Sequence, residues 1–214
     1  MPLLALWIPL REAAPLALLF SMTVASVVIA QDWRKIQMSS ARWLLLATVP
    51  GVPVGMLILT RGHPAVVKAT LGLLILAFAL WGLSARKAPE IRGARGWVIG
   101  CGFLAGVLGG AYAMSGPPLV VYGVMRRWTA QQFRATLQAY FLPGGLMVAV
   151  GYWVSRLWVA EVLRLYLISL PVLVPAVVLG TYINRRLHGD VFLKIVYVGL
   201  GIIGAVLVAR GLWG

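Results

Sequence analysis

Seven long stretches of the chain contain no charged residue, and the charged residues lie in the links between them. The stretches span residues 13–31, 43–60, 69–85, 96–125, 135–155, 165–184 and 195–209. Each is close to the ~17–25 apolar residues that a membrane-spanning helix needs, and none has the polar face of a helix on a soluble protein. Since they also lack the alternation typical of an outer-membrane barrel, the pattern predicts an all-α integral membrane protein.

The stretch 96–125 is too long for one crossing and too short for two. A continuous helix of this length would extend about 45 Å, beyond the ~30 Å hydrocarbon core of a bilayer. Its middle contains Gly109-Gly110 and Gly116-Pro117-Pro118, which disfavour a continuous helix. The stretch is therefore either one crossing with a surface segment or a broken re-entrant hairpin that returns to its starting side.

The basic residues favour the hairpin. The chain has 19 Lys and Arg against 5 Asp and Glu. A single crossing would divide the basic residues 10 to 9, whereas a hairpin leaves 13 on one side and 6 on the other. Because cytoplasmic loops are enriched in Lys and Arg, we predict about six spanning helices plus the hairpin, with the 13-residue side cytoplasmic. The smaller set consists of Arg11, Arg61, Lys68, Arg156, Arg164 and Arg210.

The two halves of the chain resemble each other. Pro50 and Pro53 interrupt one apolar stretch, as Pro171 and Pro175 interrupt another. Each half reads as a broken segment followed by three spans, so the second half should run opposite to the first, as in transporters built from inverted repeats. Chance similarity between apolar sequences is the alternative. The predicted units are a first repeat that is N-terminally incomplete, a basic cytoplasmic linker and a second repeat, over residues 1–85, 86–95 and 96–214.

The break in the hairpin is the candidate site. A helix that starts inside a membrane presents unpaired N–H groups and the positive end of its dipole, which favour an anion. Glycines permit close approach to the backbone, while hydroxyl, amide and guanidinium groups could donate hydrogen bonds. A packing kink with no ligand is the alternative. The candidate substrate-binding residues are Gly109, Gly110, Tyr112, Ser115, Gly116, Pro117, Pro118, Arg134, Thr136 and Gln138.

Other kinds of function find little support in the sequence. The five acidic residues lie at the ends of apolar stretches or in links, which disfavours a buried proton relay or cation site. There is no metal-ligand cluster, no phosphate-binding glycine loop and no acid pair typical of an enzyme, so we predict no cofactor, no metal and no catalytic residue. The basic residues favour topology and lipid contacts over nucleic acid.

Two motifs give the chain a resemblance to a known family. The segment Gly116-Pro117-Pro118-Leu119-Val120-Val121-Tyr122, after Gly109-Gly110, and the later Phe133-Arg134-Ala135-Thr136 resemble the sulfite exporter TauE/SafE permeases. The resemblance covers essentially the whole chain. It implies a multi-pass protein of the bacterial inner membrane that exports or takes up sulfite, organosulfonates or related anions.

The leading hypothesis is therefore a secondary transporter of a small anion that works by alternating access at the helix breaks. The expected partners are the anion, the lipid bilayer and, in a homo-oligomer, further copies of the chain. The alternative is a non-transporting or truncated membrane scaffold or assembly subunit.

Overall fold

The computed structural model describes residues 4–32, 38–84, 95–186 and 189–213, and within these ranges every regular element is a helix. The apolar composition explains this, because a chain in lipid must satisfy its backbone hydrogen bonds within each segment. The helices are α1 (Leu4–Trp7), α2 (Leu10–Asp32), α3 (Met38–Arg61), α4 (Pro64–Ser84), α5 (Arg95–Tyr112), α6 (Gly116–Met125), α7 (Ala130–Val154), α8 (Ala160–Arg186) and α9 (Gly189–Trp213).

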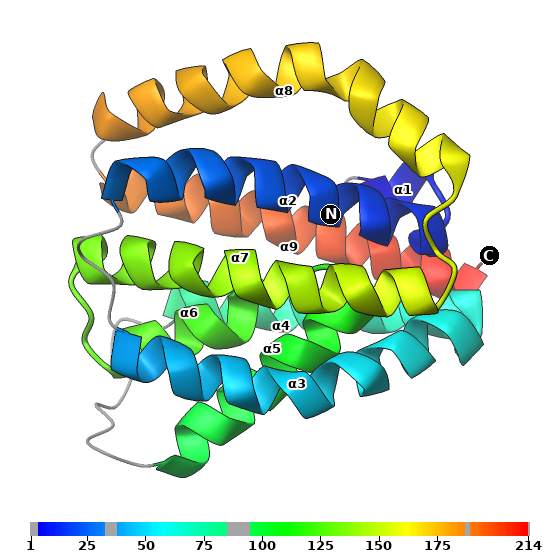
Figure 1. Ribbon diagram of the computed structural model, residues 1–214, viewed down its shortest axis with the longest axis horizontal. Helices are drawn as coiled ribbons and strands as arrows, with labels where there is room; N and C mark the ends of the chain where they lie inside the picture. Colours follow the sequence, from blue (N-terminus) through cyan, green and yellow to red (C-terminus); the bar gives the residue numbers. More distant parts are fainter. Residues whose placement is uncertain (1–3, 33–37, 85–94, 187–188, 214) are drawn as a thin grey trace.

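The long helices lie roughly side by side in a bundle (Figure 1). In this view α8, α2, α7 and α3 follow one another from top to bottom, with α4 and α9 behind them. Two stretches, Ala41–Arg61 and Pro64–Leu83, are long and apolar enough to cross a membrane, and shorter apolar stretches occur in α5, α6, α7 and α9.

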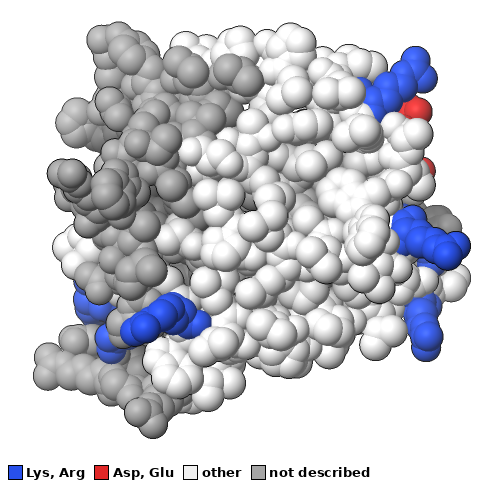
Figure 2. Space-filling model, in the orientation of Figure 1, with Lys and Arg blue, Asp and Glu red and all other residues white. Residues whose placement is uncertain are grey.

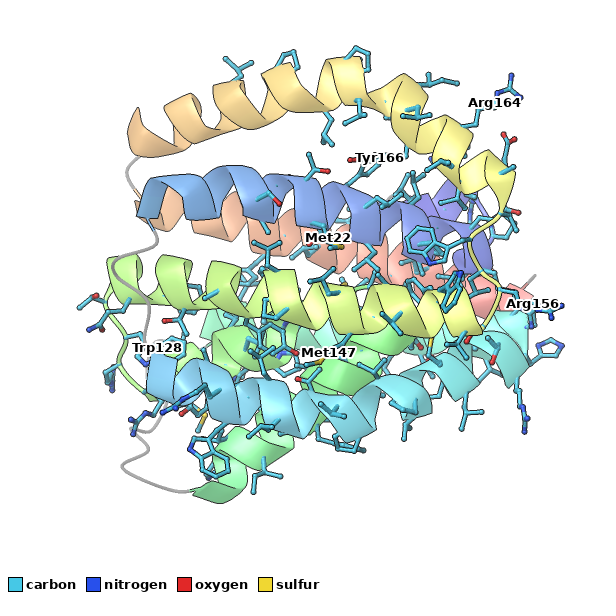
Figure 3. All side chains as sticks on the ribbon, viewed as in Figure 1. Met22, Trp128, Met147, Arg156, Arg164 and Tyr166 are labelled. Atoms are coloured by element: carbon cyan, nitrogen blue, oxygen red, sulfur yellow. The ribbon has the colours of Figure 1, made fainter. Side chains whose placement is uncertain are left out.

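Charged side chains lie at the two ends of the bundle and leave an uncharged belt between them on the face in view (Figure 2). Arg156 and Arg164 lie at one end, and Trp128 lies at the other (Figure 3). Many large apolar side chains on the helices are exposed, including Leu73, Ile168 and Val172, which are each more than 60% accessible. Such a surface suits a lipid environment rather than water.

The predicted break in the stretch 96–125 is present. Helix α5 ends at Tyr112 and α6 begins at Gly116. Helix α6 then runs back along α5, because Leu119 and Tyr122 of α6 share a buried cluster with Cys101 of α5. The segment therefore forms a helical hairpin, in agreement with the interpretation favoured by the basic residues.

The expectation that proline pairs interrupt the spans was wrong. Helix α3 continues through Pro50 and Pro53, and α8 continues through Pro171 and Pro175. A proline removes one backbone hydrogen bond and bends a helix, but neighbouring helices can compensate for the loss in a membrane protein.

Glycines bring α3 and α5 unusually close together. Gly51 and Gly55 of α3 face Gly106 and Gly110 of α5, and a Cβ atom added to any of the four would lie 2.2–2.5 Å from a carbonyl oxygen of the other helix. Small residues spaced four apart permit this close backbone approach in membrane helices. The contact fixes the position of α5, and hence of the break at its end, relative to α3.

Candidate functional site

The break between α5 and α6 consists of Ala113, Met114 and Ser115. Ala113 has φ of 50°, in the left-handed region where helices commonly end. Its N–H donates to the carbonyl of Gly109 at 2.8 Å, and the N–H of Met114 donates to the carbonyl of Leu108 at 3.2 Å. These bonds satisfy carbonyls at the end of α5 and turn the chain back towards α6.

Helix α6 begins with few free backbone donors. Ser115 is its N-cap but makes no capping hydrogen bond, and two prolines follow Gly116 in the first turn. Because proline has no N–H, Gly116 supplies the only backbone donor among the first three helical residues. A Cβ atom added to Gly116 would meet nothing within 4 Å, so the space on the Cβ side of this residue is open.

A cluster of buried hydroxyl groups lies next to the break. The side chain of Ser115 lies near the hydroxyl of Tyr140 on α7. The Tyr140 hydroxyl lies 2.6 Å from Oγ1 of Thr48 on α3. Thr48 and Tyr140 are each only 1% exposed. We call Ser115, Tyr140 and Thr48 the hydroxyl cluster. Its members come from three parts of the chain that are distant in sequence.

The hydrogen-bond chain through this cluster has a preferred direction. Oγ1 of Thr48 lies 2.8 Å from the carbonyl oxygen of Leu44 and 3.0 Å from that of Gly102. A hydroxyl has one proton to donate, and a carbonyl can only accept, so Thr48 donates to a carbonyl and accepts from Tyr140. Tyr140 in turn accepts from Ser115. An anion beside Ser115 would favour the reverse direction, in which Tyr140 donates to Ser115 and Ser115 donates to the anion.

Two of the predicted site residues meet at this cluster. A Cβ atom added to Gly109 would lie 2.5 Å from Oγ of Ser115, so the glycine leaves the space into which the serine folds. The carbonyl of Gly109 also accepts a 3.3 Å hydrogen bond from the hydroxyl of Tyr152, which is fully buried. Gly109 therefore positions Ser115 rather than offering a surface to a ligand.

Two other predicted residues face away from the cluster. A Cβ atom on Gly110 would lie 2.5 Å from the carbonyl oxygen of Val52, so Gly110 serves the packing of α5 on α3. The hydroxyl of Tyr112 donates to the carbonyl of Val67 at 3.1 Å and lies 2.7 Å from Oγ1 of Thr70. Its hydrogen bonds thus join α5 to α4.

The remaining candidates lie on α6, which begins at the break, and on α7. Pro117 and buried Pro118 form the first turn of α6. Thr136 is 1% exposed and lies one turn before Tyr140 on α7, which places the two on the same side of that helix. Arg134 and Gln138 belong to α7 by their backbone, but their side chains lie outside the described part of the structure.

Thr48 and Tyr140 were not among the residues predicted from the sequence. Both are hydroxyl-bearing residues within charge-free stretches, and this is the only feature of the sequence that could have indicated them as site residues. Nothing in the spacing along the chain indicates that they converge on Ser115, because their proximity arises from the packing of α3 and α7 against α5.

The family model of the sulfite exporter TauE/SafE family matches residues 1–207 of the 214-residue chain. The chain belongs to this family. No curated protein and no solved structure matches it. Membership supports a membrane transporter and agrees with the apolar helices described above. Among the described residues, no group of three His, Cys, Asp or Glu side chains could hold a metal ion.

Proposed function

We propose that this TauE/SafE-family chain is a multi-pass permease of the bacterial inner membrane that moves a small anion, such as sulfite or an organosulfonate, by alternating access. The observation that carries the proposal is the hydroxyl cluster beside the open space at Gly116. The segment α5–α6 serves as a re-entrant hairpin whose break lies at the depth of the membrane, where irregular backbone needs a protein-lined or wet cavity.

Neutral donors suit a transported anion. Ser115 and the N–H of Gly116 can solvate an anion without a fixed positive charge beside it, and Tyr140 orients Ser115 by donating to its hydroxyl. Hydrogen bonds to charged groups contribute about 1.5–3 kcal/mol each, so a few of them permit binding that is still weak enough for release. Without the anion, Ser115 donates to Tyr140 and Tyr140 donates to Thr48, so the empty site has a stable arrangement of its own.

The packing of the helices supports two inverted repeats with six spans. In the predicted repeat, α2, α3 and α4 correspond to α7, α8 and α9. Helix α2 packs on α7 and α4 packs on α9, so each of these pairs joins equivalent helices. Helix α3 packs on α7 as α8 packs on α2. This reciprocal pattern is what a two-fold relation between the halves requires, and it suits alternating access.

The test is uptake of radiolabelled sulfite into proteoliposomes. Gly116→Leu should fold, because its side chain enters open space, but should block the donor beside Ser115 and reduce uptake at least tenfold. Gly100→Leu is the matched control, because Gly100 also has nothing within 4 Å but lies in α5 away from the break. Equal uptake by the two variants would contradict the site.

Hydroxyl removal gives a second comparison. Tyr140→Phe should weaken anion affinity about 2- to 10-fold, the factor that corresponds to loss of the neutral hydrogen bond from Tyr140 to Ser115. Tyr166→Phe removes a hydroxyl on α8 that is hydrogen-bonded to Thr23 on α2. It should leave the anion affinity unchanged. If the unaltered protein gave no more uptake of sulfite, taurine or other organosulfonates than empty liposomes, the membrane scaffold would become the better hypothesis.

A further inference from the structure

A cavity lies where α1, α2, α3 and α4 meet, and the carbonyl of Val67, one of its lining residues, accepts a hydrogen bond from Tyr112 at the end of α5. Its volume is about 540 Å³, within the range of ligand-binding pockets. Its walls come from α1 and the start of α2, the end of α3 and the start of α4. The lining residues include Leu6, Ile8, Leu59 and Val67, so most of the wall is apolar.

The polar part of the wall is positively charged. Arg11 and Lys68 both line the cavity, and no acidic residue does so. The Arg11 guanidinium donates one hydrogen bond to the carbonyl of Thr60, which holds it in place and leaves other N–H groups to donate. Helices α2 and α4 also begin here, at Leu10 and Pro64, so the positive ends of two helix dipoles add to the charge of the side chains.

The surroundings of the cavity match the edge of a bilayer. Trp7 lines it and is 85% exposed, and exposed tryptophans are typical of the membrane–water interface. The cavity lies at the same end of the bundle as Arg156 and Arg164, where the uncharged belt stops (Figures 2 and 3). A ligand here would meet two cations at the level of the head groups and apolar walls below them.

We propose that this cavity binds an anionic phospholipid, with the phosphate at Arg11 and Lys68 and the upper part of an acyl chain against Leu6, Leu59 and Val67. Basic pockets between membrane helices bind lipid head groups on the cytoplasmic side of membranes, and in this proposal Arg11 and Lys68 use the same chemistry on the side with six basic residues. A small inorganic anion would satisfy the two cations but would leave the apolar wall uncovered. A zwitterionic lipid would cover the wall but bring a positive group towards Arg11 and Lys68.

The experiment titrates the full chain in dodecyl maltoside with phosphatidylglycerol or with phosphatidylcholine of the same acyl chains. Thermal unfolding is followed by labelling of Cys101, the single cysteine of the chain, which is buried. Phosphatidylglycerol should raise the midpoint more than phosphatidylcholine does. Lys68→Gln should weaken the affinity for phosphatidylglycerol about fivefold, and Arg11→Gln with Lys68→Gln about 25-fold, since each basic residue contributes ~1 kcal/mol at an anionic surface.

The control variant is Arg164→Gln. Arg164 lies at the same end of the bundle, its side chain is 73% exposed, and it is outside the cavity. This variant should respond to phosphatidylglycerol as the unaltered protein does. Because each protein is compared with itself at different lipid concentrations, a lower starting stability of the Arg11→Gln variant does not affect the result.

Two outcomes would overturn the proposal. One is an unchanged response to phosphatidylglycerol in the double variant. The other is equal stabilisation by glycerol phosphate, which has the head group without the acyl chains and would identify a soluble anion as the ligand. The transport proposal is tested separately by sulfite uptake in the Gly116→Leu and Tyr140→Phe variants, so failure of the lipid site and failure of the transport proposal are distinguishable.

Discussion

Replacement of Gly106 by alanine should separate α3 from α5. The added Cβ would lie 2.4 Å from the carbonyl oxygen of Thr48, whereas ordinary contacts of a Cβ atom begin at 3.4 Å. The nearest neighbours are all backbone atoms, of Thr48 and Gly51, so no side chain can rotate away. Relief requires the two helices to move apart by about 1 Å, the difference between these distances.

The free-energy cost of the Gly106→Ala clash follows from comparison with a matched variant, Gly100→Ala. Inserting a methyl group into a close-packed contact costs about 1–3 kcal/mol, while alanine gains about 0.5–1 kcal/mol over glycine in a helix. Gly100→Ala should show only the gain, because nothing lies within 4 Å of its added Cβ. Since the helical gain is common to both variants, their difference should equal the packing cost of about 1–3 kcal/mol.

The native cysteine provides the assay. Cys101 is buried in a cluster with Leu44 of α3 and Ala105 of α5, so a thiol-reactive dye reaches it mainly in molecules in which this contact has opened. When opening is at equilibrium, the labelling rate follows the open population. Gly106→Ala should therefore label roughly 5 to 150 times faster than Gly100→Ala. Equal labelling rates would refute the view that the α3–α5 contact depends on glycine.

Three further substitutions have defined outcomes. Ala113→Gly should raise the free energy of unfolding by about 1 kcal/mol, because glycine adopts the left-handed conformation without strain; a lower thermal midpoint would contradict this explanation. Thr48→Val should lower stability by about 1 kcal/mol, the usual contribution of a hydrogen bond, and should weaken sulfite binding, which titration of thermal stability would measure. Tyr112→Phe should lower stability by a similar amount, because it loses its hydrogen bond to Val67, but should leave sulfite binding unchanged. Altered sulfite binding would place Tyr112 in the site.

The sequence was sufficient to predict the helices and the break. Charge-free stretches correspond to helices because a backbone in lipid has few alternatives. The glycines and prolines of residues 109–118 mark the break correctly because they act locally, on their own segment of chain. Ser115 was identified for the same reason, since it lies within the break.

The roles of individual residues depended on long-range packing and could not be predicted. Gly110 and Gly109 are neighbours in the sequence, yet one faces α3 and the other accommodates Ser115, because consecutive residues on a helix point in different directions. Thr48 and Tyr140 carry no local signal of a site. The continuity of α3 through Pro50 and Pro53 likewise depends on what its neighbours supply.

The close contact of α3 with α5 has a consequence for movement. A Cβ atom added to these glycines would meet carbonyl oxygens of the other helix, so the backbones have little room to slide. We therefore expect the two helices to move together and to carry Thr48 and, through the short turn at the end of α5, Ser115. Tyr140 belongs to α7 and is the one member of the hydroxyl cluster that lies outside α3 and the α5–α6 hairpin. If the proposed alternating access moves α7 relative to α3 and α5, the hydrogen bond between Tyr140 and Thr48 is the contact that has to break.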